Sequence, residues 1–302
     1  MTIATNPENP TKILRSDTLH LIKHTAFQSI TLGTVILASI LMSTSSTIAQ
    51  PPLQLLVKRF IIIRSLAGTV QYRAENSTST AQVGQRLTEV GDAIITGKNS
   101  SATLAIDEGI GTIQVSEKTE LSIERLQRSN GGFVTQLKIN GGQIRLKIRP
   151  FTNSNSKIEV ITPAGVSGVR GTEFGVSVLP SGKTGLATLN GKVTLEAQSV
   201  VVNVDRGLQS TVITKEPPSP PSPLINDPTV TLDMIARRDG GRSVQLMGKT
   251  DSVNLILIGD TIIETDRTGN FNVVVLLPND RRLPLLSTTP LGRKQSYVIQ
   301  VP

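Results

Sequence analysis

Two alternating apolar runs, joined by a glycine-rich bend, make up residues 158–178, which read I-E-V-I-T-P-A-G-V-S-G-V-R-G-T-E-F-G-V-S-V. Apolar side chains occupy every second position from Ile158 and again from Phe174, and glycines recur every third residue between the runs. Alternation with a period of two predicts half-buried strands, and the glycines predict a tight, irregular turn. The stretch therefore predicts a strand, a turn and a second strand.

Short alternating runs separated by turn residues continue on both sides, over residues 52–214. Asn-Gly pairs at 140–141 and 190–191 predict two hairpins, because Asn-Gly is the strongest short hairpin signal. Some ten short strands without a helical pattern predict an all-β domain, built as a β-sandwich, a barrel or a β-roll. The hairpin spacing favours antiparallel pairing, and the repeated glycines leave a short β-solenoid as an alternative.

Two motifs in this region resemble the FecR family. Its members commonly carry a T-P-x-A-x-x-G-V-R-G-T-E-F-like run, matched here by Thr162, Pro163, Gly168, Val169, Arg170, Gly171, Thr172, Glu173 and Phe174. They often show G-x-x-L-x-x-G-D-x-I-x-T-G further upstream, matched here by Gly84, Leu87, Gly91, Asp92, Ile94, Thr96 and Gly97, with one residue more between Leu87 and Gly91 than in that pattern. The resemblance covers about residues 64–213, and it implies a FecR-like periplasmic domain that interacts with other envelope proteins.

The first 49 residues have the order of a targeting segment. A polar, basic stretch is followed by an apolar run from Ile30 to Met42, and then by small polar residues up to Ala49. This order predicts a secretory signal peptide that is cleaved after Ala49. The alternative is an uncleaved signal anchor, since residues 30–49 approach the ~20 residues needed to span a bilayer. Either way, we expect the rest of the chain to be periplasmic or extracellular.

A proline-rich stretch at residues 215–228 is predicted to be a linker, because P-P-S-P-P-S-P at 217–223 favours polyproline II structure. Residues 229–302 resemble small bacterial immunoglobulin-like modules, which implies a second, smaller β-sandwich. Acidic residues at 260, 264 and 266 lack the regular spacing of a calcium loop, so residues 266–270 are interpreted as a plain turn.

A strand with a basic face is the first candidate binding feature. Arg145, Lys147 and Arg149 alternate with apolar residues, and we expect Lys138 to join them from the partner strand of the hairpin. One interpretation is contact with an anionic surface polymer or with phospholipid headgroups. The other is a solvated face, or an edge strand that charge protects from aggregation.

The glycine-rich bend is the second candidate. Arg170 and Glu173 either form a recognition edge for a partner protein, or Arg170 holds the bend by bonding to turn carbonyls or to Glu173. Gly168 and Gly171 are expected to provide a positive φ or close packing.

The composition argues against catalysis and cofactors. The chain contains no cysteine, and its two histidines, His20 and His24, lie in the predicted targeting segment. A mature chain would then lack Ser-His and Cys-His pairs and the usual transition-metal ligands. A net charge of +8 with only 3% aromatic residues is too weak a signal for a nucleic-acid partner. We therefore predict a protein that is not an enzyme and uses no cofactor or metal.

The predicted function is binding of an envelope protein partner, in envelope signalling or assembly. Binding to cell-wall or surface polysaccharide is a second hypothesis. A third, implied by the family resemblance, is a membrane-anchored regulator of an iron-responsive sigma factor. That role uses a longer cytoplasmic segment than the residues that precede Ile30 here. Membrane contact is expected only if the N-terminal segment stays uncleaved.

Overall fold

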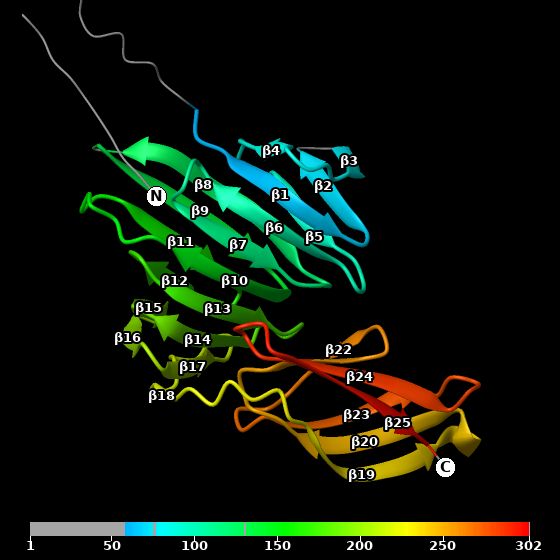
Figure 1. Cartoon of the computed structure of the whole chain (residues 1–302). Helices are drawn as coiled ribbons and strands as arrows, with labels where there is room; N and C mark the ends of the chain where they lie inside the picture. Colours follow the sequence, from blue (N-terminus) through cyan, green and yellow to red (C-terminus); the bar gives the residue numbers. More distant parts are fainter. Residues whose placement is uncertain (1–57, 75–76, 130, 302) are drawn as a thin grey trace, which may run out of the picture. The chain divides into compact units, whose positions relative to one another are not determined.

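The computed structural model describes residues 58–74, 77–129 and 131–301, which form strands, connecting loops and one short 3-10 turn at Asp239–Gly241 (Figure 1). This confirms the all-β prediction. The targeting segment predicted at residues 1–49, with both histidines, lies outside the described residues. None of the helical structure in those three ranges is long and apolar enough to cross a membrane. Leu55–Pro302 form one compact unit.

The first part of this unit is a β-sandwich of two nine-stranded sheets, which we call the N-terminal sandwich. In spatial order, the first sheet contains β18 (Ser222–Pro223), β17 (Leu208–Val212), β14 (Thr184–Asn190), β13 (Glu173–Val178), β10 (Gly142–Ile148), β7 (Gly111–Val115), β6 (Ser101–Ile106), β1 (Ile61–Ala67) and β4 (Arg86–Leu87). The second sheet contains β16 (Val200–Asp205), β15 (Lys192–Ala197), β12 (Val166–Val169), β11 (Lys157–Ile161), β9 (Gly132–Ile139), β8 (Glu120–Ser129), β5 (Ala93–Thr96), β2 (Val70–Ala74) and β3 (Ser77–Thr80).

The chain builds this sandwich by alternating between the sheets. From β6 onward, consecutive strands join the two sheets alternately in pairs, except that β10 enters the first sheet alone between β9 and β11 of the second, so the sheets grow side by side along the sequence. All pairs are antiparallel except β9 with β11, which is parallel. The apolar side chains between the sheets form one core, and the alternation predicted at residues 144, 146 and 148 is confirmed because all three are buried.

The two Asn-Gly hairpin predictions are wrong. The strands before and after residues 140–141 are β9 in the second sheet and β10 in the first, and β14 and β15 are divided in the same way at residues 190–191. Both pairs are therefore corners at which the chain changes sheet. Asn-Gly supplies the backbone for a sharp turn, but it does not determine whether the next strand pairs with the previous one or crosses the core.

The bend within residues 158–178 also differs from the prediction, because it contains a strand of its own. After β11 the chain turns at residues 162–165 and forms β12, which pairs antiparallel with β11 in the second sheet. It then crosses at residues 170–172 into β13 of the first sheet. The three glycines thus lie in a turn, in a strand and in a crossing, rather than in one irregular loop.

The proline-rich segment is attached to the sandwich rather than extended as a free spacer. Pro223 and Ser222 pair with Leu208 and Gln209 of β17, and the Ser219 hydroxyl accepts a 3.0 Å hydrogen bond from the Thr211 amide. These bonds place the segment along the edge of the first sheet.

The last part of the chain is a smaller, seven-stranded antiparallel sandwich, the C-terminal sandwich. Its three-stranded sheet contains β19 (Thr231–Arg238), β20 (Ser243–Lys249) and β23 (Asn270–Leu276). Its four-stranded sheet contains β22 (Thr261–Ile263), β21 (Leu255–Ile258), β24 (Arg282–Thr288) and β25 (Lys294–Gln300). A separate hydrophobic core lies between these sheets.

The C-terminal sandwich contacts the outer face of the first sheet. Gln143 Nε2 donates to the Thr289 carbonyl over 2.6 Å, and the Gln209 amide donates to both carboxylate oxygens of Asp251. Backbone from the C-terminal sandwich approaches Gly175 so closely that a Cβ there would lie 1.9 Å from the Pro290 oxygen. One face of β10, β13 and β14 is therefore covered, and a free binding surface has to be sought elsewhere.

Candidate functional site

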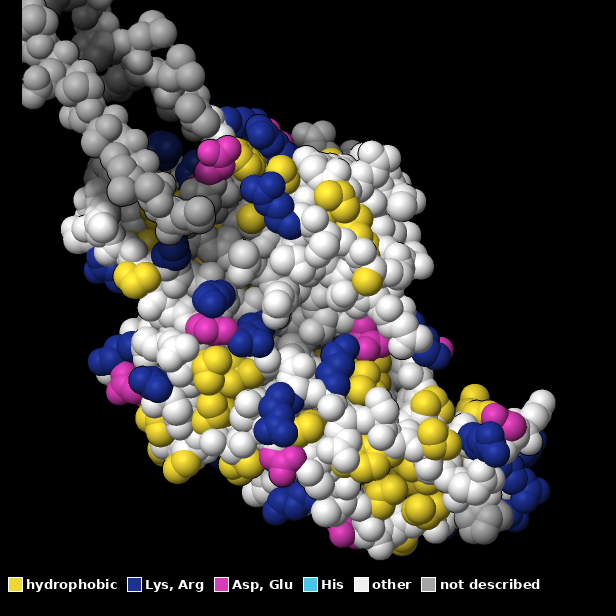
Figure 2. All heavy atoms as spheres, in the orientation of Figure 1, with side chains coloured by type: hydrophobic (Ala, Val, Ile, Leu, Met, Phe, Trp, Pro, Cys, Tyr) yellow, Lys and Arg dark blue, Asp and Glu magenta, His cyan; other side chains and the backbone are white. Residues whose placement is uncertain are grey.

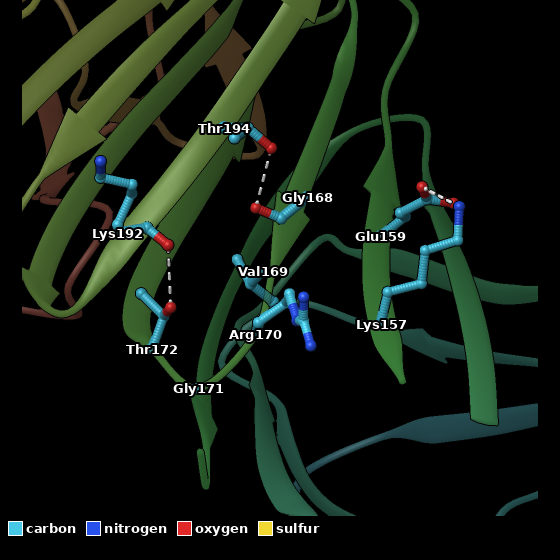
Figure 3. Close-up of a pocket in the computed structure, with 9 residues that line it drawn as sticks. All are labelled: Lys157, Glu159, Gly168, Val169, Arg170, Gly171, Thr172, Lys192 and Thr194. Carbon is cyan, nitrogen blue, oxygen red and sulfur yellow. Dashed lines mark hydrogen bonds and ion pairs between the residues drawn. The ribbon is translucent and has the colours of Figure 1, made fainter. Parts of the chain in front are cut away.

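The outer face of the second sheet contains an open groove of about 480 Å³ between β11, β12 and β15 (Figure 3). Five consecutive residues of the family-like motif, 168–172, line it together with Lys157, Glu159, Lys192 and Thr194. The motif was recognised as a sequence pattern, and the structure shows that its centre surrounds one surface feature.

The groove exists because the middle of its floor has no side chain. Gly168 pairs with Glu159 on one side and Thr194 on the other, so the three residues form a row across three strands. A Cβ at Gly168 would lie 2.7 Å from Thr194 Oγ1, which itself donates to the Gly168 carbonyl over 3.1 Å. The expectation of close packing at Gly168 is confirmed, and any larger residue would fill the groove.

Lys157 and Glu159 form one wall, and their charges neutralise each other. Lys157 Nζ lies 2.8 Å from Glu159 Oε1, and Gln136 Nε2 donates to the other oxygen over 2.6 Å. Burial tends to raise the pKa of Glu159, but the hydrogen bonds from Lys157 and Gln136 outweigh it and hold the pKa below its ordinary value. Glu159 is therefore an ionised, fully bonded carboxylate and not a free base.

Arg170 contributes the cation with the fewest internal partners in the groove. Its guanidinium donates to the Asn153 carbonyl over 3.4 Å, which is a weak bond, and it has no ion pair with any residue that the structure describes. The predicted bond between Arg170 and Glu173 is wrong: Glu173 accepts from Arg145 of β10 and, over 3.4 Å, from Asn190. Glu173 therefore joins strands of the first sheet, and Arg170 remains available to a ligand.

Gly171 and Thr172 fix the crossing that carries Arg170. Gly171 has a φ of +112°, and a Cβ there would lie 2.4 Å from the Cα of Pro150. Both expectations for this glycine, positive φ and close packing, are confirmed. Thr172 Oγ1 donates to the Lys192 carbonyl over 3.0 Å and ties the crossing to β15.

The remaining motif residues support the fold around the groove. Thr162 caps the turn between β11 and β12, where its hydroxyl accepts from the Gly165 amide over 3.2 Å. Pro163 lies against Gly182 of the neighbouring turn. Val169 and Phe174 are buried in the core, with Phe174 fully enclosed. The motif thus combines residues that line the groove with residues that support its backbone.

The four basic residues predicted to contact an anionic surface do not form one patch. Lys138 lies on β9 of the second sheet, 3.7 Å from Glu124, whereas Arg145 and Lys147 lie on β10 of the first. Strand β10 is internal to its sheet, so the edge-strand interpretation is wrong. Arg145 is held by Glu173 and by the Leu291 carbonyl of the C-terminal sandwich. Figure 2 shows basic side chains interspersed with acidic and apolar ones on the face in view.

Arg149 follows β10 and has no side-chain hydrogen bond or ion pair with any described residue. It lines a second, separate pocket, together with Arg128 of β8.

The turn at residues 266–270 is structural. The Asp266 carboxylate accepts hydrogen bonds from the amides of Thr268 and Asn270 and from both of their side chains. Burial opposes the charge, but these bonds lower the pKa of Asp266. Over the part of the chain that the structure describes, no three acidic, histidine or cysteine side chains gather in a way that could hold a metal ion.

Sequence reasoning missed four residues of the groove: Lys157, Glu159, Lys192 and Thr194. The first two precede the motif, and the other two lie 18 and 20 residues after Phe174, on a strand that the Asn-Gly pattern assigns to a hairpin. Their alternation along β11 and β15 could have placed them on an outward face. The pairing of these strands with β12 is what brings them together, and it depends on the fold of the whole sandwich.

Comparison with known proteins agrees with the motif. Residues 92–194 match the family model described as FecR protein. Two crystal structures of a candidate anti-sigma factor from Parabacteroides distasonis ATCC 8503 are similar to this chain at 12% identity, with TM-scores of 0.36 and 0.38. Each similarity covers 44% of this chain and 59% of the other. No curated protein matches the chain. The matched residues include β11, β12, the Arg170 crossing and all nine residues that line the groove, and residues 92–194 of the N-terminal sandwich are therefore the part of this chain that is similar to the FecR family.

Proposed function

We propose that this chain is a regulatory protein of the cell envelope, and that its FecR-like N-terminal sandwich binds a protein partner in the groove around Arg170. The observation that carries the proposal is the convergence of residues 168–172, the centre of the family motif, on one open groove. The C-terminal sandwich covers the face of the first sheet nearby, whereas the groove on the second sheet stays open. The groove is therefore the surface of the motif that a partner can reach.

The groove favours an extended, acidic segment of the partner. Its floor runs along β12 at the glycine, between walls formed by β11 and β15, which suits one extended chain. Glu159 is already bonded by Lys157 and Gln136, and Lys192 lies 3.5 Å from Asp205 at an exposed position where ion pairs are weak. The guanidinium of Arg170 can then form a two-pronged bond with a carboxylate of the ligand.

We further propose that the protein is exported by its N-terminal segment and acts by binding rather than catalysis. The groove holds cations, a bonded carboxylate and two threonines, which suit recognition. We also propose that the C-terminal sandwich is an immunoglobulin-like module. Its first, second and fifth strands form one sheet and the remaining four form the other, and this two-sheet division of seven antiparallel strands supports the proposal.

Site-specific photo-crosslinking in cells tests the groove. A photo-reactive residue replaces Thr194, which is exposed in the groove, or Thr78, which is exposed on β3 at the opposite edge of the same sheet. We expect a discrete protein adduct from position 194 and none from position 78. The change Arg170→Glu should remove the adduct, because it reverses the charge that a partner carboxylate contacts.

Other results would contradict binding in the groove or would favour a different class of ligand. Adducts of equal yield from both positions, or an adduct that Arg170→Glu leaves unchanged, would contradict binding in the groove. Retention of the wild-type protein on purified peptidoglycan or anionic glycan, weakened by salt and without a protein adduct, would instead support a polysaccharide ligand.

A further inference from the structure

A second pocket, of about 590 Å³, lies at one end of the N-terminal sandwich, where three connections meet. These are the turn between β6 and β7, the turn between β8 and β9, and the loop that follows β10. Asn153 of this loop donates to the Gly131 carbonyl over 2.9 Å, and its own carbonyl accepts from Arg170. The pocket is therefore held by internal bonds, and it adjoins the groove without sharing a lining residue with it.

Two arginines without partners line this pocket. Arg128 and Arg149 are both exposed, and neither side chain makes a hydrogen bond or ion pair with any residue that the structure describes. No aspartate or glutamate lines the pocket. The guanidinium of Arg149 lies across Gly109, where a Cβ would come within 2.8 Å of Nη2. Two positive charges thus converge on a cavity whose own lining holds no carboxylate, and Arg128 also borders the adjoining pocket that contains Asp107 and Glu108.

The pocket also has an apolar lining with aromatic rings. Phe133 and Phe151 meet edge to face, with ring centroids 4.8 Å apart. Beyond the pocket, the buried guanidinium of Arg59 lies 4.8 Å from the centroid of the Phe133 ring, and its Nη2 has no hydrogen-bond partner. Asp107, 2.8 Å away, neutralises the charge of Arg59, so this guanidinium supports the Phe133 ring and adds no net charge to the pocket. The cavity combines a charged rim with an apolar, aromatic surface.

We propose that this pocket binds a phosphate group that is carried next to an apolar moiety. Two planar guanidinium forks suit a phosphate group, whose free oxygens, three in a monoester and two in a diester, can accept bonds from both arginines and carry one or two negative charges. The aromatic surface beside them would hold the apolar part of the ligand. Such a ligand can be a phospholipid headgroup in a membrane or a soluble phosphate ester.

The test uses the full chain in two arms. The first is co-sedimentation with phosphatidylglycerol vesicles and with phosphatidylcholine vesicles, and the second is calorimetric titration with phenyl phosphate, which carries an aromatic ring next to its phosphate. The variant Arg128→Gln/Arg149→Gln removes both guanidinium groups. The control Arg206→Gln/Arg237→Gln removes the same net charge at two exposed arginines that lie outside the pocket and have no side-chain bonds to described residues. Thermal unfolding of each variant checks that the fold is kept.

We expect binding in at least one arm, weakened at least about tenfold by the pocket variant and left unchanged by the control, because bonds to charged groups are the stronger class of hydrogen bond. Binding to phosphatidylglycerol vesicles alone identifies a lipid headgroup, and binding of phenyl phosphate alone identifies a soluble ester. Equal weakening by the pocket and control variants would show that binding reflects net charge, and it would overturn the proposal. Absence of binding in both arms would also overturn it.

Discussion

Replacing Gly175 with alanine should disturb the contact between the two sandwiches. Gly175 lies on the outer face of β13, and an added Cβ would be 1.9 Å from the Pro290 oxygen and 2.3 Å from its carbonyl carbon. Ordinary contact begins at 3.4 Å, so the two backbones must separate by about 1.5 Å. Strand β13 cannot retreat, because it is hydrogen-bonded on both sides and its inward residues Phe174 and Val176 are fully buried.

The segment at residues 289–291 must therefore move, and its displacement breaks two hydrogen bonds to the first sheet. Gln143 Nε2 donates to the Thr289 carbonyl over 2.6 Å, and Arg145 Nη1 donates to the Leu291 carbonyl over 3.0 Å. A neutral hydrogen bond contributes ~1 kcal/mol and one with a charged donor ~2 kcal/mol. The expected loss in the free energy of unfolding is therefore about 2–4 kcal/mol.

Denaturant unfolding measures this loss, and hydrogen exchange locates it. Gly141→Ala is the matched control, since a Cβ at Gly141 meets nothing within 4 Å and its φ is not positive. We expect faster amide exchange at residues 289–293 in Gly175→Ala and unchanged exchange in Gly141→Ala. If the two variants agree within about 0.5 kcal/mol and show the same exchange, the inferred contact between the sandwiches is wrong.

Three other substitutions affect buried groups, and the structure predicts how each one changes the free energy of unfolding. Asp107→Ala removes the partner, 2.8 Å away, of the buried Arg59 guanidinium, and should cost about 3–5 kcal/mol of unfolding free energy, with Glu108→Ala as the exposed control. Phe174→Ala empties a fully enclosed core position and should cost about 3–5 kcal/mol, measured by denaturant unfolding. Burial lowers the pKa of Lys183 to about 8, against the charges of Asp266, Glu264 and Asp251. The folded state therefore loses this proton before the unfolded state does, and stability should rise between pH 8 and 10.5 by up to about 3 kcal/mol. Lys183→Met should remove that rise, and an unchanged pH profile in this variant would contradict the assignment.

Local patterns in the sequence predicted the strands and their buried faces well. Alternation at residues 102–106, 144–148 and 174–178 identified side chains that are buried in the structure. Burial of one face of a sheet imposes that alternation wherever the strand pairs, so the signal survives without knowledge of the topology. The family motif likewise marked the region that forms the groove.

The connections between strands could not be predicted in the same way. The Asn-Gly pairs at 140–141 and 190–191 encode sharp turns, but the choice between a hairpin and a change of sheet depends on which strands already flank the site. For the same reason, the bond between Arg145 and Glu173 could not be predicted. The two residues are 28 positions apart and meet only because β10 and β13 are neighbours in the sheet. Apart from the glycine itself, no sequence pattern indicates that the C-terminal sandwich packs on Gly175.

The central claim is that the Arg170 groove binds a protein partner, and the most direct test is the dissociation constant of the crosslinked partner for wild-type protein and for Arg170→Glu. Arg206→Glu is the control, because Arg206 is exposed and does not line the groove. The account predicts that Arg170→Glu weakens binding at least about tenfold and that Arg206→Glu leaves it unchanged, since loss of one charged hydrogen bond is enough for this effect. Equal dissociation constants for wild type and Arg170→Glu would contradict it.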